Sequence, residues 1–71
     1  MTTLKKFLDT QIGEHGRVEI LRSSGTFLCE GIVKDLRQSP LWRLMDEENA
    51  KCKQAMHIEK ADGKYVQIMI A

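Results

Sequence analysis

The stretch RVEILRSSGTFLCEGIVKDL, residues 17–36, decides the fold that we expect for this 71-residue chain. Val18 and Ile20 alternate with Arg17, Glu19 and the apolar Leu21, a pattern that indicates a strand. The residues Ser23-Ser24-Gly25 lie between two apolar runs and are typical of a turn. The second run contains Gly31, and a glycine inside a strand often marks a bulge or a close backbone approach. The stretch therefore predicts a β-hairpin over residues 17–34.

The N-terminal segment has the pattern of a short amphipathic helix. Leu4, Phe7 and Leu8 are spaced so that they share one face of a helix. A threonine just before them can cap the helix, because its hydroxyl accepts a hydrogen bond from a free backbone N–H. Gly13 ends the pattern, since glycine readily adopts the left-handed conformation of a C-cap. These signals predict a helix over residues 3–12.

The C-terminal segment predicts a second hairpin. An Asp-Gly pair at residues 62–63 supplies the backbone conformations that a tight turn needs. After it, Val66, Ile68 and Ile70 alternate with other residues and place one apolar face on a strand. We therefore expect a hairpin over residues 54–70.

A helical insert is expected between the two hairpins, over residues 39–53. It opens with a Ser-Pro pair, and serine at the N-cap followed by proline is a favourable helix start. In an α-helix, Leu41, Leu44 and Met45 would share a buried face. The acidic run that follows suits the start of a helix. The insert is therefore either a single turn followed by a second helix that Asp46 caps, or one continuous helix.

Together these elements predict a single α+β domain over residues 1–71. Its N-terminal helix packs on a small, mostly antiparallel four-stranded sheet, and the helical insert joins the two hairpins. A second arrangement stays open, because the bent, glycine-containing hairpin also resembles a Sm-like or SH3-like small barrel. The expected core consists of Leu4, Phe7, Leu8, Val18, Ile20, Phe27, Val33, Leu44, Met56, Ile58, Val66, Ile68 and Ile70.

Composition narrows the class of protein. Hydrophobic residues make up 42% of the chain and charged residues 30%, which is typical of a globular domain. Eleven Lys and Arg against ten Asp and Glu argue against a general polyanion binder. Two cysteines are too few for a disulfide framework and suit a reducing compartment. With no apolar run long enough to span a membrane and no signal-peptide pattern, we expect a cytoplasmic protein.

Candidate catalytic and metal-binding residues do not form a recognised pattern. Cys29 and Cys52 are the candidate nucleophiles, and His15 and His57 the candidate bases, but no spacing pairs a thiol with a histidine. Structural zinc sites supply their ligands in close pairs, and only the Cys52–His57 spacing comes near. We therefore expect no enzymatic activity, no metal and no cofactor.

The insert holds the candidate binding surface. It contains the only tryptophan of the chain, and tryptophan and methionine flanked by arginine are typical anchors of protein interfaces. Two interpretations of Trp42 remain open, because it either covers the rim of the core or forms a contact surface. The candidate contact residues are Leu41, Trp42, Met45, Arg37 and Arg43.

The order of motifs resembles small uncharacterised proteins of phages, prophages and conjugative elements of Firmicutes. The segments TLKKFL, RVEIL, SSGTFLCEGIVKDL and YVQIMI carry this resemblance, which covers most of the chain. The insert between Arg37 and Gln54 is longer than the family pattern. The resemblance implies a mobile-element protein that binds a host or phage macromolecule, as anti-CRISPR proteins do, and it transfers no functional residue.

We therefore expect a non-enzymatic protein-interaction module with an unidentified protein partner. A homodimer, formed through an exposed sheet edge or the Trp42 patch, is the alternative to a foreign partner. A small nucleic-acid-binding barrel is the alternative function. Nucleic acid is the less favoured partner, because the chain lacks a basic stripe with stacking aromatic residues.

Overall fold

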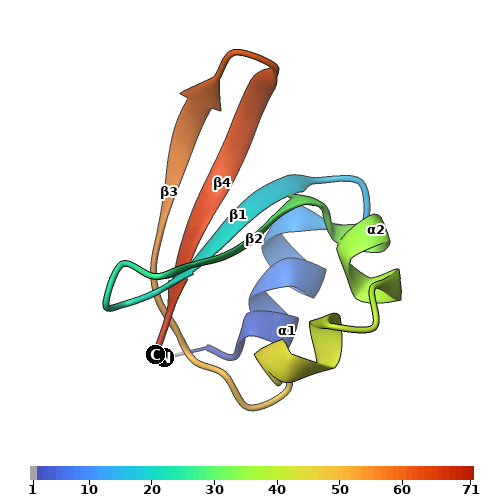
Figure 1. The fold of residues 1–71 in the computed structure, drawn as a ribbon, viewed down its shortest axis with the longest axis vertical. Coiled ribbons are helices and arrows are strands. Elements are labelled where there is room, and N and C mark those ends of the chain that lie inside the picture. The colour runs from blue at the N-terminus through green and yellow to red at the C-terminus, as the bar shows by residue number, and fades with distance from the viewer. Residues whose placement is uncertain (1) are drawn as a thin grey trace.

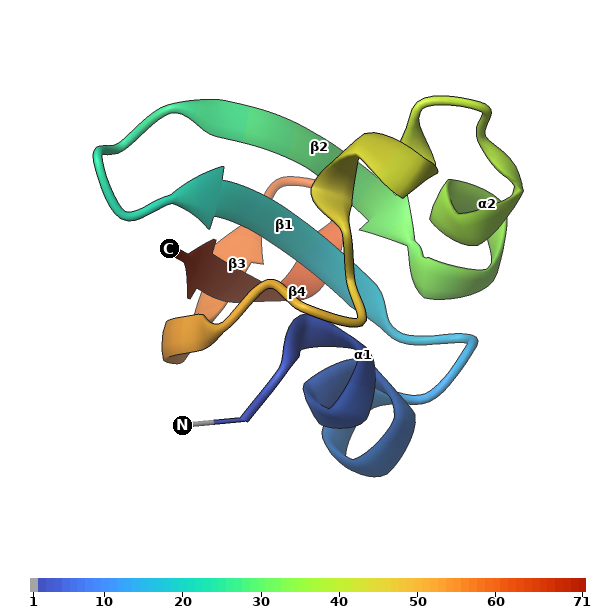
Figure 2. The same ribbon diagram turned by 90° about the horizontal axis from the view of Figure 1, so that it is seen from below.

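The computed structural model describes residues 2–71 and confirms the α+β class. The strands form one sheet in the order β2-β1-β4-β3, and the helical segments gather on one side of it (Figures 1 and 2). In chain order the elements are α1 (Leu4–Phe7), η1 (Leu8–Ile12), β1 (Arg17–Arg22), β2 (Phe27–Ile32), α2 (Val33–Gln38), η2 (Trp42–Met45), β3 (Cys52–Lys60) and β4 (Gly63–Ile70).

Two antiparallel hairpins, β1–β2 and β3–β4, are joined side by side through a parallel pairing of β1 with β4. In this central pair Val18 lies opposite Val66, and Ile20 lies opposite Ile68. The sheet is therefore mixed and open, with β2 and β3 at its edges. The barrel arrangement is not the observed fold, because the two edge strands are not paired with each other.

The N-terminal helix forms as its sequence pattern predicts. The Thr3 hydroxyl accepts a hydrogen bond from the backbone N–H of Lys6 and so caps α1. The helix continues from Leu8 as η1, a π-helical turn, in which the N–H of Gly13 bonds to the carbonyl of Leu8 at 2.7 Å. Gly13 then ends the helix with a φ of 84°, a left-handed conformation that favours glycine.

The helical insert differs from the prediction in both position and length. The second strand ends at Ile32 rather than continuing to residue 34, and α2 begins at once. The expected helix over 39–53 is wrong, because this segment contains only η2, a single 3-10 turn. Asp46 does not cap a second helix, since it adopts a left-handed conformation with a φ of 50° and reverses the chain. Strand β3 follows from Cys52.

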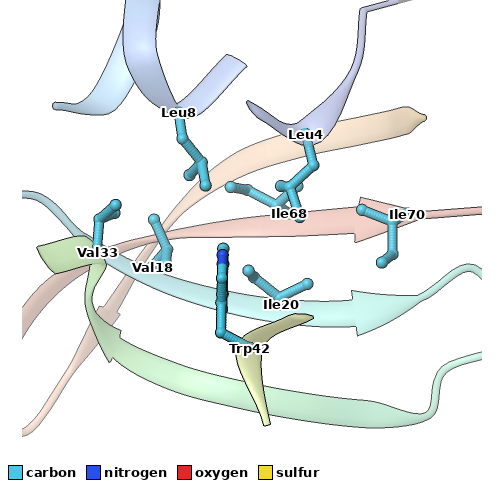
Figure 3. Close-up of a cluster of buried hydrophobic side chains, with 8 residues drawn as sticks. All are labelled: Leu4, Leu8, Val18, Ile20, Val33, Trp42, Ile68 and Ile70. Carbon is cyan, nitrogen blue, oxygen red and sulfur yellow. The ribbon is translucent and has the colours of Figure 1, made fainter. Parts of the chain in front are cut away.

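The core lies between the helical segments and the central strands (Figure 3). Helix α1 and η1 supply two fully buried leucines, and the parallel pair of strands supplies most of the remaining core. Figure 3 shows the Trp42 ring rising from η2 into the space beside Val18 and Ile20. The buried residues of this cluster are Leu4, Leu8, Val18, Ile20, Val33, Trp42, Ile68 and Ile70.

Three residues of the expected core are exposed, and each has a local reason. Phe27 is 54% exposed, because a β-bulge after Ile20 places it opposite Leu21 on the face of the sheet away from the helices. Met56 is 44% exposed on the edge strand β3. Leu44 is 71% exposed, because the insert forms a 3-10 turn instead of an α-helix.

The face of the sheet away from the helices carries a network of charged and polar side chains. Glu19 lies on this face yet is only 8% exposed, because Lys60 from the end of β3 forms ion pairs with both Glu19 and Glu30. Gln67 donates a hydrogen bond to Glu19 at 3.0 Å. The Lys60 ammonium also lies 4.9 Å from the centre of the Tyr65 ring. The network therefore ties the tip of the second hairpin to the first hairpin.

This network predicts a specific loss of stability in acid. The hydrogen bond from Lys60, followed by that from Gln67, lowers the pKa of Glu19 below its ordinary value of 4.5. A lowered folded-state pKa stabilises the fold above pH 4.5, and the contribution is lost as the pH falls through the folded-state pKa. We expect the unfolding free energy of wild type, measured by urea titration, to fall more steeply below pH 4.5 than that of Glu19→Gln. Equal pH dependence of the two proteins would contradict the role given to Glu19.

Candidate functional site

An apolar groove opens between β2 and the insert. The groove is a hollow of about 110 Å³ on the outside of the core, and apolar side chains make up most of its lining. It combines residues from β2, from α2 and from η2, so that only the folded insert creates it. The lining residues are Leu28, Cys29, Leu36, Ser39, Leu41, Trp42 and Met45.

The 3-10 geometry of η2 determines which side chains face the groove and the core. A 3-10 helix has three residues per turn, so side chains three positions apart stack on the same side. Trp42 and Met45 consequently point inward, whereas Leu41, which also lines the groove, and Leu44 are exposed. The sequence pattern predicts that Leu41, Leu44 and Met45 share the buried face of an α-helix, and this prediction is wrong for the two leucines. The 3-10 turn exchanges Trp42 for the two leucines, which are 67% and 71% exposed.

Glu47 holds the insert against the rest of the domain. The indole N–H of Trp42 donates a hydrogen bond to Glu47 Oε2, and Arg37 Nη2 lies 3.1 Å from Glu47 Oε1. The backbone carbonyl of Glu47 accepts a hydrogen bond from the N–H of Lys5 at 2.8 Å. One residue therefore connects α1, α2 and η2.

Arg37 completes this connection on the side of the N-terminal helix. Its Nη2 atom lies 2.8 Å from Asp9 Oδ1, and Lys5 Nζ lies 3.0 Å from the other oxygen of the same carboxylate. The hydrogen bonds from Lys5 and Arg37 lower the pKa of Asp9. The Arg37 guanidinium is thus engaged inside the domain, whereas Arg43 lies exposed on η2.

The five candidate contact residues consequently occupy four different settings. Leu41 and Arg43 are exposed, Met45 lies half-buried in the groove, and Trp42 forms its floor as part of the core. Arg37 is held in ion pairs. Sequence reasoning missed Leu44, Leu28 and Leu36 as surface or groove residues. The period-3 spacing of Leu41 and Leu44 was the available signal, but the same spacing also fits an α-helix.

The thiols and histidines show no activated nucleophile. Partial burial raises the pKa of both Cys29 and Cys52, which favours the protonated, unreactive thiol. Cys29 lines the groove, whereas His57 lies on the edge strand β3 at the other side of the sheet. Within residues 2–71, no three His, Cys, Asp or Glu side chains come together in a way that could hold a metal ion.

Comparison with known proteins gives no match, either to a family model, to a curated protein or to a solved structure. In the part of the chain that the structure describes, no helix is long and apolar enough to cross a membrane.

The position of Trp42 predicts a large effect on stability. Trp42→Ala removes a buried indole and leaves a cavity beside Val18 and Ile20, which typically costs about 3–5 kcal/mol of unfolding free energy. Trp42→Phe keeps most of the packing and loses the hydrogen bond to Glu47, so its cost is expected to be smaller. Urea unfolding followed by circular dichroism measures both. A loss below about 0.5 kcal/mol for Trp42→Ala, the range typical of exposed positions, would contradict the core position.

Proposed function

We propose that this chain is a non-enzymatic protein-interaction module that binds an apolar segment of a partner protein at the groove beside η2. The observation that carries the proposal is the exposure of Leu41 and Leu44 on a rigidly held turn. A 71-residue domain has little apolar mass to spare, yet it leaves these two leucines in contact with water. Exposed apolar groups beside a hollow are typical of a binding surface.

The support of the insert favours recognition by a preformed surface. The Glu47 carboxylate fixes Trp42 and Arg37, and Trp42 packs in the core under the groove. A binding surface that is already ordered loses less conformational entropy when the partner docks. Arg43, exposed on the same turn, is positioned to contact a polar rim of the partner.

The proposed biological setting rests on the sequence resemblance and on the thiols. The resemblance to small mobile-element proteins supports a host or phage macromolecule as the partner, in an anti-CRISPR-like role. The two free cysteines suit a reducing compartment such as the cytoplasm.

Selection from a library of random peptides tests the groove without a known partner. We expect the selected peptides to carry large apolar side chains and to lose about tenfold or more in affinity for Leu41→Asp, because a central apolar anchor contributes more than about 1 kcal/mol. Phe27→Asp is the matched control, since Phe27 is also an exposed large apolar residue but lies outside the groove. Peptides that bind Leu41→Asp as tightly as wild type, or that lose affinity equally for both variants, would refute the groove as the binding site.

A further inference from the structure

Strand β3 is an edge strand whose middle is exposed. Gln54, Ala55, Met56 and His57 are all exposed, although Ala55 lies directly opposite the fully buried Ile68. The helical layer covers β1 and β4 but stops short of β3. As a result, an open cleft of about 280 Å³ borders the strand. It is lined by Phe7, Gln11, Ile12, Ala55, Met56, His57 and Val66.

The N-terminal segment limits how much of this edge is available. The N–H of Cys52 donates to the carbonyl of Thr2 at 2.9 Å, and Thr3 forms a bridge with Lys51. Within residues 2–71, β3 otherwise pairs only with β4, so its outer edge is open over residues 53–60. This stretch contains neither proline nor glycine, and it carries no Asp, Glu, Lys or Arg between Lys53 and Glu59. Edge strands that avoid association usually carry charged residues or proline.

We propose that a second copy of this chain pairs with this edge, antiparallel, around a two-fold axis at Met56. This inference goes beyond the proposed function and uses the opposite edge of the sheet from the groove. Antiparallel pairing of identical strands in one continuous sheet keeps each residue on its own face. One residue must therefore lie directly opposite its own counterpart, with the axis between the two. In the exposed middle of the strand, this residue can be Ala55, Met56 or His57.

Charge and strand length select the Met56 register. With the axis at Ala55, the pairing ends at Lys53, because the backbone N–H of Cys52 already donates a hydrogen bond to Thr2. This register also places Lys53 opposite His57 of the second copy. An axis at His57 pairs no opposite charges. An axis at Met56 uses residues 53–59 and sets Lys53 opposite Glu59 of the second copy, twice in each dimer. Opposite charges facing each other across strands are favourable.

The neighbouring side chains fit the same register. Glu59 lies opposite Lys64 in the β3–β4 ladder, so the second copy's Lys53 extends a row of alternating charge across the interface. Lys53 stands at the β-bulge that shifts the β3–β4 register, at the end of the open edge. In this register Ala55 lies opposite His57 of the second copy. The open cleft that Ala55 and His57 line leaves room for the imidazole ring. Met56, which is 44% exposed, becomes covered by its own counterpart.

A charge-reversal cycle tests the proposal. Pairing through one strand edge makes a small interface, so we expect a dissociation constant in the micromolar range. In sedimentation equilibrium, Lys53→Glu and Glu59→Lys should each weaken the dimer by about tenfold or more, because two attractive pairs become repulsive. The double variant should return to within about threefold of wild type, since the pairs are restored with opposite sign. Lys51→Glu is the control of equal charge change, and it should leave dimerisation unchanged because Lys51 lies outside the open edge.

Disulfide cross-linking of single-cysteine variants then determines the register. In these variants Cys29 and Cys52 are replaced by alanine. Met56→Cys should form an intermolecular disulfide under mild oxidation, whereas Ala55→Cys and His57→Cys should not, because only residue 56 meets its own counterpart. A wild-type protein that stays monomeric throughout the micromolar range overturns the proposal. A dimer that ignores both charge reversals, or that links through position 55 or 57, also overturns it. Leu41→Asp, which tests the groove, should leave dimerisation unchanged, so the two proposals can fail separately.

Discussion

The parallel pairing of β1 with β4 is the constraint on which the rest of the structure depends. It joins two hairpins that are separated by the whole insert, and its apolar face supplies Val18, Ile20, Ile68 and Ile70 to the core. Once these two strands occupy the centre of the sheet, β2 and β3 must lie at its edges. The helical layer is too small to cover four strands, so the edge strands are left partly uncovered. Both proposed surfaces, the groove beside β2 and the open edge of β3, follow from this incomplete cover.

Helices α1 and α2 both begin with backbone N–H groups that donate hydrogen bonds to carbonyls of loops elsewhere in the chain. The first N–H groups of α1, those of Leu4 and Lys5, bond to the carbonyls of Ala50 and Glu47. Helix α2 repeats the arrangement, since the N–H groups of Val33 and Lys34 bond to the carbonyls of Gly16 and Glu14. Free N–H groups at a helix start need hydrogen-bond acceptors. Here backbone carbonyls distant in sequence accept from them, and in α1 the Thr3 side chain accepts one more. The short helices therefore depend on the tertiary fold more than on their own sequence.

This dependence explains what could be predicted from the sequence. The hairpin turns and the Thr3-capped helix are specified by neighbouring residues, and they were predicted correctly. Helix α2 was missed because its N-cap, Ile32, has no side chain that can accept a hydrogen bond. The inward position of Trp42 depends on the partner that its indole finds in Glu47. The acidic residues of the insert are compatible with either a second helix or one continuous helix, whereas in the structure Glu47 accepts a hydrogen bond from the Trp42 indole beside a single 3-10 turn. The exposure of Leu41, which lines the groove, and of Leu44, which lies outside it, follows from the same turn.

The two proposed surfaces are compatible because the sheet separates them. The groove involves β2 and the insert, and the self-pairing edge is β3, with β1 and β4 between them. A dimer through β3 forms one continuous sheet with a groove near each end, so neither groove is covered. Two identical grooves on one rigid body bind a partner with repeated or symmetric sites much more tightly than a single groove does, because the second contact forms at a high effective concentration. Self-association of this kind would allow a shallow groove of about 110 Å³ to support specific binding in a chain that is too small to build a large interface.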